Sequence, residues 1–395
     1  MIDFEEAIAT VAEAAVPSDR ERVSIDEAHG RMLARDVHAM VSAPMRDVSA
    51  MDGYAVRETD LGTAPAHLRV IGARFPDSAD RGMLSPGECM RVFTGAPIPD
   101  DSDRVVIQEI VRREGEMAII EEMPGAAHHI RARGSDFANG DLILQAGRML
   151  DYRALVAAAG ADVAILDVWR QPRVVVLSTG DELTDPGIAR EAEGRVPESI
   201  SFGLLALVSA WGGQPVGRRR LADDLATMQR IAGNTIEDID LVVVTGGASV
   251  GEKDFARAMF APFGLELLFS KVAIKPGKPV WFGRTGNALV LGLPGNPTSA
   301  LVTARLFLAP LVMGLAGGDP YGALRWRSTP LAVPLPPCGD RETFFRGRWN
   351  GMLVEPMIDQ SSSAQKTLAN SDVLIRRRPS ASAAQAGEAV EVLEL

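Results

Sequence analysis

The middle of the chain alternates between strand-like and helix-like segments, and this alternation constrains the fold more than any other feature. From about residue 170, apolar runs in RVVVLSTGDEL, DLVVVTGGASVGEKDF and ALVLGLPGNP each end in a glycine-containing loop. Helix-like segments such as SISFGLLALVSAWGG and DDLATMQRIAGNTIED lie between them. Repeated alternation of this kind predicts a doubly wound, mostly parallel α/β domain with helices on both faces of its sheet, which we expect at 170–318.

The regions on either side of this domain have different patterns of apolar and turn-forming residues. Helical spacing near residues 3–15 and 149–161 predicts a helical N-terminal domain, made of 1–40 together with 138–169 as a helical and linker region. Short apolar runs broken by Pro, Gly and Asp predict a β-rich domain inserted at 41–137. Similar runs predict a small C-terminal domain at 319–395 that is β-barrel-like or a sandwich. The expected fold class is therefore multidomain, α/β plus β.

Length and charge narrow the function classes. A chain of 395 residues is expected to form two to four domains. Its formal net charge of -11 argues against sequence-independent binding to nucleic acid, which needs a basic surface. The acidic, amphipathic start MIDFEEAIATVAEAA does not resemble a signal peptide, and no apolar run of membrane-spanning length is evident. Cys89 and Cys338 lie far apart and indicate no disulfide framework. We expect a cytoplasmic protein that binds no membrane.

Loops after the predicted parallel strands indicate an anion-binding pocket. Strand ends of this kind meet at one edge of an α/β sheet, where backbone N–H groups next to small residues can bind phosphate oxygens. A single glycine-rich loop is better explained by a tight turn alone, but three in one domain favour a shared pocket. Neither a dinucleotide-binding nor a P-loop signature occurs. The candidate residues are Thr179, Gly180, Asp181, Gly246, Gly247, Ser249, Pro294, Gly295 and Asn296.

Lysines next to these loops indicate positive charge for such an anion. Lys271, Lys275 and Lys278 cluster in KVAIKPGKPVWFG, which we interpret as a hairpin over 271–283 around Pro276 and Gly277. Surface lysines usually serve only as solvated charges. Since the chain is acidic and these lysines gather beside the predicted phosphate-binding loops, we interpret them as anion clamps.

Carboxylates gather at the same predicted loop ends, where they would repel a phosphate unless a cation lay between them. Magnesium suits this arrangement because it prefers one or two carboxylates together with phosphate oxygens. An alternative for Asp223, equally compatible with the sequence, is that it caps the following helix. The acidic residues concerned are Asp181, Glu182, Asp223, Asp224, Glu252 and Asp254.

The predicted inserted domain gives weaker signals. Asp52-Gly53 by itself indicates a turn, and the Thr94 hydroxyl could simply bond its own backbone.

Across the chain, the histidines have no metal-ligand spacing, and no Ser/His/Asp or Cys/His arrangement supports nucleophilic catalysis.

Motifs along nearly the whole chain resemble one known family. SAMDGYAV, FTGAPIP, GSDF, STGDEL, TGGASVGEKDF, AIKPGKP and GLPGNPTSA occur in this order. Together they resemble the molybdopterin molybdenumtransferase family, which includes bacterial MoeA and the gephyrin E-domain. The resemblance implies a cytoplasmic homodimer of four-domain subunits that inserts molybdenum from molybdate into adenylated molybdopterin, with Mg²⁺ and release of AMP. It also points to molybdopterin adenylyltransferase and apo-molybdoenzymes as protein partners.

The resemblance also implies roles for single residues. It places Asp52, Thr94 and Asp136 at the active cleft, facing the α/β domain of the other subunit. Glu182, Asp254 and one of Asp223 or Asp224 would hold Mg²⁺ or the adenylyl group, and Glu182 and Asp254 join the catalytic set. The residues expected to contact phosphate or molybdate are Lys271, Lys275, Lys278, Ser299 and Arg346, and Ser362 is expected beside them.

Departures from the family pattern leave alternative functions open. The chain reads PESISFG where the family has an Asp-Ser-Asn triplet, so Ile200 replaces an amide that could recognise the pterin or cap a helix. SSSAQKT at 361–367 replaces a second family segment, in which Ser362 alone keeps its place. A diverged paralogue that carries the pterin cofactor or acts as a scaffold is therefore the main alternative. A related adenylyltransferase would not require the inserted and C-terminal β domains.

Overall fold

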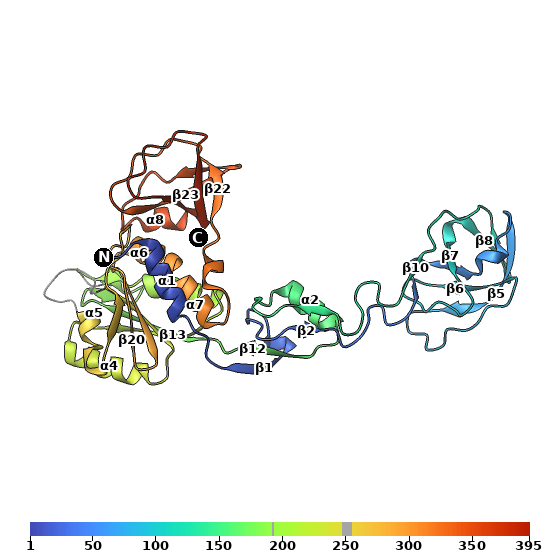
Figure 1. Cartoon of the computed structure of the whole chain (residues 1–395), viewed down its shortest axis with the longest axis horizontal. Helices are drawn as coiled ribbons and strands as arrows, with labels where there is room; N and C mark the ends of the chain where they lie inside the picture. Colours follow the sequence, from blue (N-terminus) through green and yellow to red (C-terminus); the bar gives the residue numbers. More distant parts are fainter. Residues whose placement is uncertain (192, 247–254) are drawn as a thin grey trace.

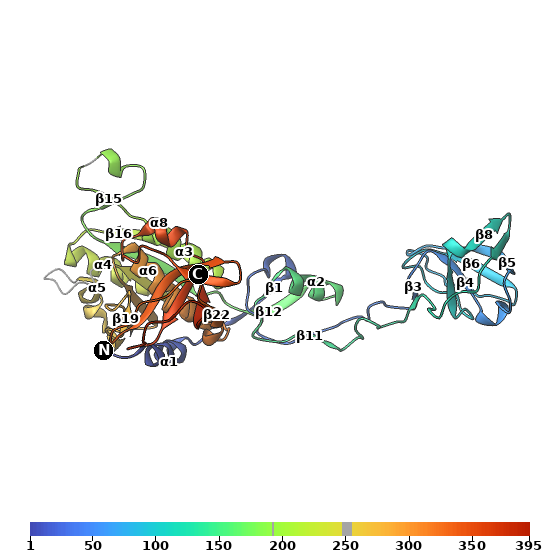
Figure 2. The same ribbon diagram turned by 90° about the horizontal axis from the view of Figure 1, so that it is seen from above.

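The molecule is elongated, with the α/β and C-terminal parts packed together at one end and the inserted β-rich part at the other (Figure 1, Figure 2). The computed structural model describes residues 1–191, 193–246 and 255–395. A small middle region carries α2 (Tyr152–Gly160) and short antiparallel strand pairs. The predicted multidomain α/β plus β fold class is confirmed.

The central sheet is mostly parallel. In spatial order its strands are β16 (Gln214–Leu221), β13 (Arg173–Thr179), β17 (Leu241–Thr245), β21 (Ala288–Leu293), β20 (Trp281–Thr285) and β18 (Glu266–Phe269). Neighbours from β16 to β21 run parallel, and β20 and β18 continue the sheet in antiparallel fashion. β13, β17 and β21 are almost wholly buried, which suits their Val- and Leu-rich sequences because a parallel sheet is covered on both faces.

Alternate residues of the parallel strands face two separate hydrophobic cores. Val174 and Val176 lie in one core and Val175 and Leu177 in the other, as the two-residue repeat of a strand requires. One core contains residues of α1 (Phe4–Ala14), α3 (Ile200–Ala210), α6 (Pro297–Thr303) and α7 (Ala309–Leu315). The other contains residues of α4 (Leu225–Ile236) and α5 (Phe255–Ala258). Helices on both faces make the sheet doubly wound, as predicted.

The first helix packs with the α/β core, although the predicted helical domain begins at residue 1. Phe4, Ile8 and Val11 lie in the same cluster as the central strands. Asp3 caps the helix by accepting a hydrogen bond from the Glu6 N–H at 2.8 Å. The domain boundaries stay a prediction, but this packing joins the N-terminus to the α/β part.

Segment 271–283 is not the hairpin that its Pro276-Gly277 turn predicts. β19 (Ile274–Lys275) pairs in parallel with β23 (Glu342–Asn350) of the C-terminal part, whereas Trp281 begins β20 of the central sheet. The hairpin prediction is wrong because β19 and β20 pair with different sheets, although the Val272 N–H donates to the Lys278 carbonyl at 3.1 Å. The segment therefore crosses from one sheet to the other.

The inserted part forms a mixed sheet with its own core. In spatial order its strands are β7 (Arg104–Ile107), β4 (Gly53–Val56), β6 (Glu88–Val92), β5 (Ala66–Arg74), β9 (Met117–Ile120) and β8 (Val111–Glu114). Gly53 begins β4 and is paired on both sides, so the turn predicted from Asp52-Gly53 is wrong. A Cβ at Gly53 would lie 2.1 Å from the carbonyl oxygen of Val106, so glycine serves close strand packing here.

The C-terminal sheet curls until its edges meet. In spatial order its strands are β19, β23, β25 (Val373–Arg377), β26 (Ala389–Glu394) and β22 (Arg327–Pro330), and β24 (Leu353–Pro356) also pairs with β23. Leu331, directly after β22, bridges Val354 in β24, and the Ala332 N–H donates to the Val354 carbonyl at 2.8 Å. This closure gives the predicted barrel-like form. α8 (Gln365–Ala369) lies between β24 and β25 in the chain.

Short strand pairs join the outgoing and returning chain of the inserted part. β1 (Arg20–Ser24) pairs with β12 (Ile165–Trp169), β2 (Val37–His38) with β11 (Leu142–Leu144), and β3 (Val48–Ser49) with β10 (Ile130–Arg131), all antiparallel. These pairs make a double-stranded arm that carries the inserted sheet away from the central one (Figure 1). A further pair, β14 (Leu183–Thr184) with β15 (Val196–Pro197), is parallel and follows β13 in the chain.

The helical run Pro297–Leu315 lies in the core. α6 and α7 are joined by a π-helical turn, Ala304–Leu308, beside Pro310, which has no N–H to donate. Among the residues that the structure describes, this run has the length and composition to cross a membrane, but 89% of an 18-residue stretch of it is buried in the protein. Such burial is typical of a core helix.

Close packing in the central sheet gives a test of this fold. A Cβ on Gly292 would lie 2.0 Å from the indole of Trp281, which is 1% exposed. We predict that Gly292→Ala lowers the free energy of unfolding by about 1–3 kcal/mol, because the core must shift to admit the methyl group. Urea denaturation followed by tryptophan fluorescence measures this change in the free energy of unfolding.

The control Gly339→Ala adds a Cβ with nothing within 4 Å and should change the free energy of unfolding by less than about 0.5 kcal/mol. Unchanged stability of Gly292→Ala would contradict the close contact between β21 and Trp281.

Candidate active site

The loops after β13, β17 and β21 meet at one edge of the central sheet, as the sequence predicts. A Cβ on Gly246 would lie 2.6 Å from the Thr179 carbonyl oxygen, and a Cβ on Gly295 would lie 3.3 Å from the Gly246 Cα. Gly246 has a φ of +91°, which favours glycine. The absence of side chains at these positions therefore lets the loop backbones approach one another.

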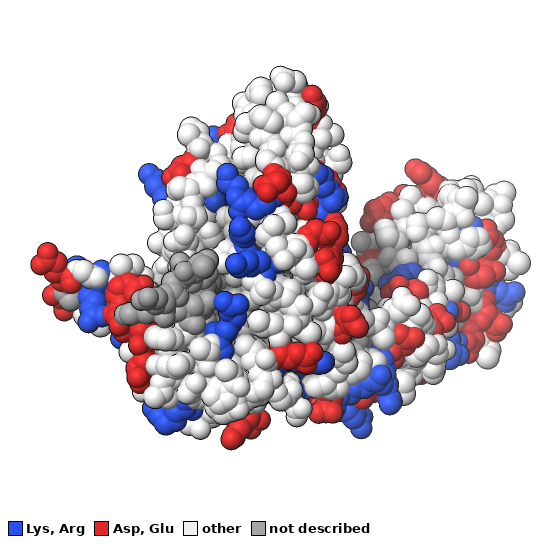
Figure 3. Space-filling model, turned by 60° about the vertical axis from the view of Figure 1, so that its left-hand side comes forward, with Lys and Arg blue, Asp and Glu red and all other residues white. Residues whose placement is uncertain are grey.

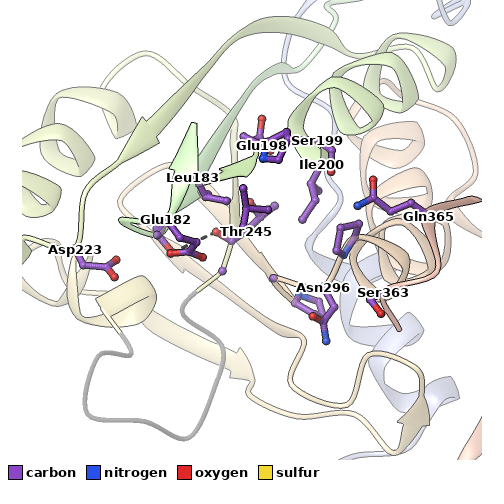
Figure 4. Close-up of a pocket in the computed structure, with 18 of the residues that line it drawn as sticks. Glu182, Leu183, Glu198, Ser199, Ile200, Asp223, Thr245, Asn296, Ser363 and Gln365 are labelled. Carbon is purple, nitrogen blue, oxygen red and sulfur yellow. Dashed lines mark hydrogen bonds between the residues drawn. The ribbon is translucent and has the colours of Figure 1, made fainter. Parts of the chain in front are cut away.

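A cavity of about 720 Å³ opens over these loop ends, and we call it the loop cavity (Figure 4). Predicted substrate-binding residues in its wall are Thr179, Gly180, Gly246, Pro294, Gly295 and Asn296. Figure 4 shows Glu182 and Asp223 on one side and Asn296, Ser363 and Gln365 on the other. Ser363 and Gln365 belong to the C-terminal part, so the cavity lies between that part and the central sheet.

The acidic residues near the loop cavity divide into two groups. Glu182 and Asp223 line the cavity, and a Cβ on Gly180 would lie 2.7 Å from both Glu182 carboxylate oxygens. Asp181 instead accepts a hydrogen bond from the Asp223 N–H at 3.0 Å. Asp224 accepts from the Thr227 N–H at 2.9 Å and caps α4, so the cap that the sequence left as an alternative for Asp223 is Asp224. Hydrogen bonds from the Thr227 hydroxyl and N–H lower the pKa of Asp224.

The donor groups of the loop cavity suit a metal that also binds phosphate. Within the described residues, no group of three or more His, Cys, Asp and Glu side chains is arranged to enclose a metal ion. Mg²⁺ often takes one or two carboxylates and completes its shell with phosphate oxygens and water. Glu182 and Asp223 fit this pattern. The predicted Gly247, Ser249 and Asp254 lie outside the described residues.

A neighbouring cavity of about 550 Å³ lies between segment 275–279 and β23, and we call it the lysine cavity. Five predicted residues line it, namely Lys275, Lys278, Ser299, Arg346 and Ser362. The two cavities share Pro279, Pro294 and Asn296 in their walls, so they adjoin. The predicted Lys271 is exposed and is not part of either wall. In Figure 3, Lys and Arg side chains follow one another down one face, from the C-terminal part at the top to the α/β part below.

Arg346 is the most deeply buried cation of the lysine cavity. It has no exposed surface, and its Nη2 donates to the carbonyl oxygens of Asp359 and Ser361, both at 3.2 Å. Its Nε and Nη1 are buried without a hydrogen-bond partner in the described structure. Burial lowers the pKa of the guanidinium. Unpaired buried N–H groups are costly, so this end of the cavity favours an anion that accepts from them.

Ser362 and Asn296 join the C-terminal part to the strand-end loops. The Asn296 side-chain amide donates to the Ser362 hydroxyl at 3.1 Å, and the Thr298 N–H donates to the Ser362 carbonyl at 3.2 Å. Both contacts lie at the start of α6. They fix the wall where the loop cavity passes into the lysine cavity.

Asp52 and Thr94 form a pair in the inserted part. Asp52 Oδ1 accepts from the Thr94 N–H at 2.8 Å and from the Thr94 hydroxyl at 2.9 Å. The Thr94 hydroxyl therefore bonds the Asp52 side chain. The hydrogen bond from the Thr94 N–H, and after it the bond from the Thr94 hydroxyl, holds the pKa of Asp52 below its usual value. The pair lies next to β4 and β6, beyond the arm (Figure 2). Asp136 is exposed between β10 and β11, and its N–H donates to the Ala43 carbonyl at 3.0 Å. One chain therefore does not bring these residues to the loop cavity.

The departure at Glu198–Ile200 changes the wall of the loop cavity without leaving the helix uncapped. Glu198 is buried, and its carboxylate accepts from the Ser201 N–H at 2.9 Å and from the Ser201 hydroxyl. Arg218 Nη1 lies 3.7 Å from the same carboxylate. Glu198 thus supplies the cap, and Ile200 adds an apolar side chain to the wall (Figure 4).

Some wall residues were not predicted as binding residues. Arg341, Thr343 and Gln360 line the lysine cavity, and Ser363 and Gln365 line the loop cavity. Arg341 had a signal, because RETFFRG places an arginine at each end of one strand-like run. The others become visible only when the C-terminal part is packed on the central sheet.

Family models match three successive segments of the chain. Residues 2–161 match the MoeA N-terminal region (domain I and II), 175–314 match a probable molybdopterin binding domain, and 328–395 match the MoeA C-terminal region (domain IV). These segments together span most of the chain, including the strand-end loops and both cavities.

Whole-chain comparisons agree with these matches. Proteins named molybdopterin molybdenumtransferase are 35% identical in Haemophilus influenzae, over 80% of this chain and 76% of that one, and 33% identical in Synechococcus elongatus, over 91% and 90%. Two crystal structures of the molybdopterin biosynthesis MoeA protein from Pyrococcus horikoshii match 100% of this chain and 99% and 100% of theirs. Their TM-scores are 0.81 and 0.84 at 26% and 24% identity. The chain belongs to the molybdopterin molybdenumtransferase, or MoeA, family.

Proposed function

We propose that this chain inserts molybdenum from molybdate into adenylated molybdopterin and releases AMP, in a cleft formed by the loop cavity and the lysine cavity. The observation that carries the proposal is that these cavities share a wall. One offers strand-end loops suited to phosphate, and the other offers basic side chains suited to an oxyanion. A phosphate-linked substrate and molybdate would therefore lie side by side.

The loop cavity would hold the phosphate-linked part of the substrate. Gly180, Gly246 and Gly295 put loop backbone in the cavity wall, and N–H groups of these loops would donate to phosphate oxygens there. α6 begins at the same wall and presents the positive end of its dipole there. Ile200, Leu183 and Pro197 form an apolar wall that suits a flat ring system.

Glu182 and Asp223 are the residues that would hold Mg²⁺. Bound there, Mg²⁺ would neutralise phosphate charge and so favour cleavage of the phosphate linkage. Asp181 would keep Asp223 at the cavity edge through its hydrogen bond to the Asp223 N–H. Asp224 would act only as the helix cap, because its carboxylate is already bonded to Thr227.

The lysine cavity would hold molybdate. Lys275 and Lys278 supply charge from exposed side chains, and Arg346 supplies the buried donors that have no partner within the described protein. Ser299 adds a hydroxyl, and Arg341 a further guanidinium. Several cations around a small cavity stabilise a divalent oxyanion more than a monovalent anion.

The complete cleft would need a second copy of the chain. Asp52 and Thr94 lie at the end of the arm, so a homodimer would let one subunit's inserted part face the other's loop cavity. Large apolar side chains exposed in the middle region support such an interface, Tyr152 and Val156 being 72% and 73% exposed. Others there are Met40, Leu142 and Ile165. We place this dimer in the cytoplasm, with molybdopterin adenylyltransferase and apo-molybdoenzymes as protein partners.

Incubation with adenylated molybdopterin, Mg²⁺ and molybdate tests the proposed function. We expect AMP release that depends on molybdate, together with activation of a cofactor-free molybdenum enzyme. Tight pterin binding with neither AMP release nor activation would contradict the transferase and favour a carrier, a result that Ile200 in the cavity wall would then help to explain.

Removing the carboxylates of the loop cavity should slow turnover. We predict that Glu182→Gln and Asp223→Asn each lower the rate about 100-fold or more and raise the Mg²⁺ concentration needed for half-maximal rate, because phosphate charge is then poorly neutralised. Asp224→Ser, which keeps a capping oxygen, should stay within about twofold of the wild type. Steady-state AMP release over a Mg²⁺ titration measures both. Equal loss in all three variants would contradict the division of roles.

Mixing inactive variants tests the shared cleft. Asp52→Ala and Lys278→Ala damage different halves of it, so co-refolded heterodimers would contain one intact site. We predict recovery of about a quarter of wild-type activity in an equal mixture of two such chains. Asp52→Ala mixed with Thr94→Ala should recover none, since both changes lie on the same arm. Recovery in neither mixture, with dimers present by light scattering, would contradict a cleft built from two copies.

A further inference from the structure

A buried arginine lies beside the lysine cavity and joins separate parts of the chain. Arg376 on β25 is 5% exposed and donates to the carboxylates of Glu342 on β23 and Glu5 on α1. Its guanidinium lies 5.0 Å from the ring centre of Phe4 and 4.8 Å from that of Trp326. One side chain thus contacts the N-terminal helix, the C-terminal sheet and the segment that links that sheet to the α/β part.

A second arginine extends this cluster toward solvent. Arg378 Nη1 lies 3.1 Å from Glu5 Oε1, and Arg378 Nη2 lies 3.2 Å from Glu391 Oε2. Burial by itself raises the pKa of Glu5, but hydrogen bonds and charge from Arg376 and Arg378 lower it overall. We call Glu5, Glu342, Arg376 and Arg378 the arginine cluster.

The N-terminus is also bonded directly to the segment that carries the lysines. The Ile2 N–H donates to the Lys271 carbonyl at 3.1 Å, and the Ala273 N–H donates to the Ile2 carbonyl at 2.8 Å. The Glu342 N–H then donates to the Ala273 carbonyl at 2.9 Å. Segment 271–273 is thus held between the first residues of the chain and the start of β23.

The same strand register positions the lysine cavity. Ile274 lies opposite Glu342 and Lys275 opposite Thr343 in the β19–β23 pair, so the residue that Arg376 holds is next to the partner of Lys275. Phe344 lines the cavity, while its ring lies 5.2 Å from that of Phe4 and 6.1 Å from that of Trp326. Arg346 follows two residues later on the same strand. A shift of β23 relative to β19 would therefore separate Lys275 from Arg346.

Stability alone does not account for such a cluster. Buried ion pairs add little net stability, because desolvation of the charges offsets their attraction, and their better attested role is to select one arrangement among several. Apolar residues of similar size could pack this region as well. The contacts of Arg376 with Glu5 and Glu342 join α1 to β23, and β23 pairs with β19.

We propose that Arg376 is a positioning residue for the lysine cavity, and that with Glu5 and Glu342 it fixes the β19–β23 register in which Lys275 and Arg346 bind one oxyanion. This proposal rests on the proposed function for the identity of the anion. Its structural part, the control of segment 271–278 by the N-terminal helix, is independent of that identity.

Two variants separate positioning from folding. Glu5→Gln removes the ion pairs with Arg376 and Arg378 from a side chain that is 62% exposed, so the variant should fold. Glu342→Gln/Arg376→Met removes both members of the buried pair and leaves no buried charge unpaired. Glu355→Gln is the control, because it removes an ion pair with Arg348 from the same sheet, away from both cavities.

Molybdate and AMP binding by calorimetry, with hydrogen exchange of 271–278, form the test. We expect both variants to weaken molybdate binding about tenfold and speed exchange in 271–278, with AMP affinity and thermal midpoint close to those of the control. Unchanged molybdate affinity and exchange would overturn the proposal, as would parallel loss of AMP and molybdate binding. If 271–278 exchanged faster in the variants but even the wild type bound no molybdate, the positioning role would be supported and the proposed function contradicted.

Discussion

The candidate site depends on one constraint of parallel sheets, that consecutive strands end at the same edge. β13, β17 and β21 are buried on both faces, so their polar continuations can emerge only where the strands stop. Their loops come within van der Waals distance because Gly246 and Gly295 have no side chains. A strand-end cavity walled by loop backbone follows from this geometry before any particular side chain is considered.

The second half of the site comes from the junction between sheets. Segment 271–283 supplies β19 to the C-terminal sheet and leads into β20 of the central one, so Lys275 and Lys278 lie where the two parts meet. The C-terminal sheet contributes Arg346, whose buried Nε and Nη1 lack partners within the described protein. The packing of the two sheets thereby brings two kinds of anion site side by side. The N-terminal helix packs against both sheets.

Local sequence patterns predicted the parts of the site that depend on short-range structure. Valine-rich runs ending in glycine predicted the strand-end loops, and the lysines of segment 271–283 predicted positive charge beside them. Arg346 was expected only from the resemblance to the family. Contacts distant in sequence were not predictable. Pro276-Gly277 has the composition of a hairpin turn, yet Ile274 pairs with Glu342. Asp223 and Asp224 are equally good caps by composition, and only the path of the chain after β16 decides that Asp224 caps α4. No pattern indicates that Glu5 meets Arg376.

We propose that a phosphate site and an oxyanion site adjoin in one cleft. Diffraction from crystals soaked with AMP and tungstate tests it most directly, because tungsten scatters anomalously and reports the oxyanion without ambiguity. We expect a tungsten peak in the lysine cavity, in contact with Lys278 and Arg346, and the AMP phosphate at the strand-end loops beside Gly180 and Gly246. Tungsten bound at the strand-end loops, or AMP bound away from them, would contradict it.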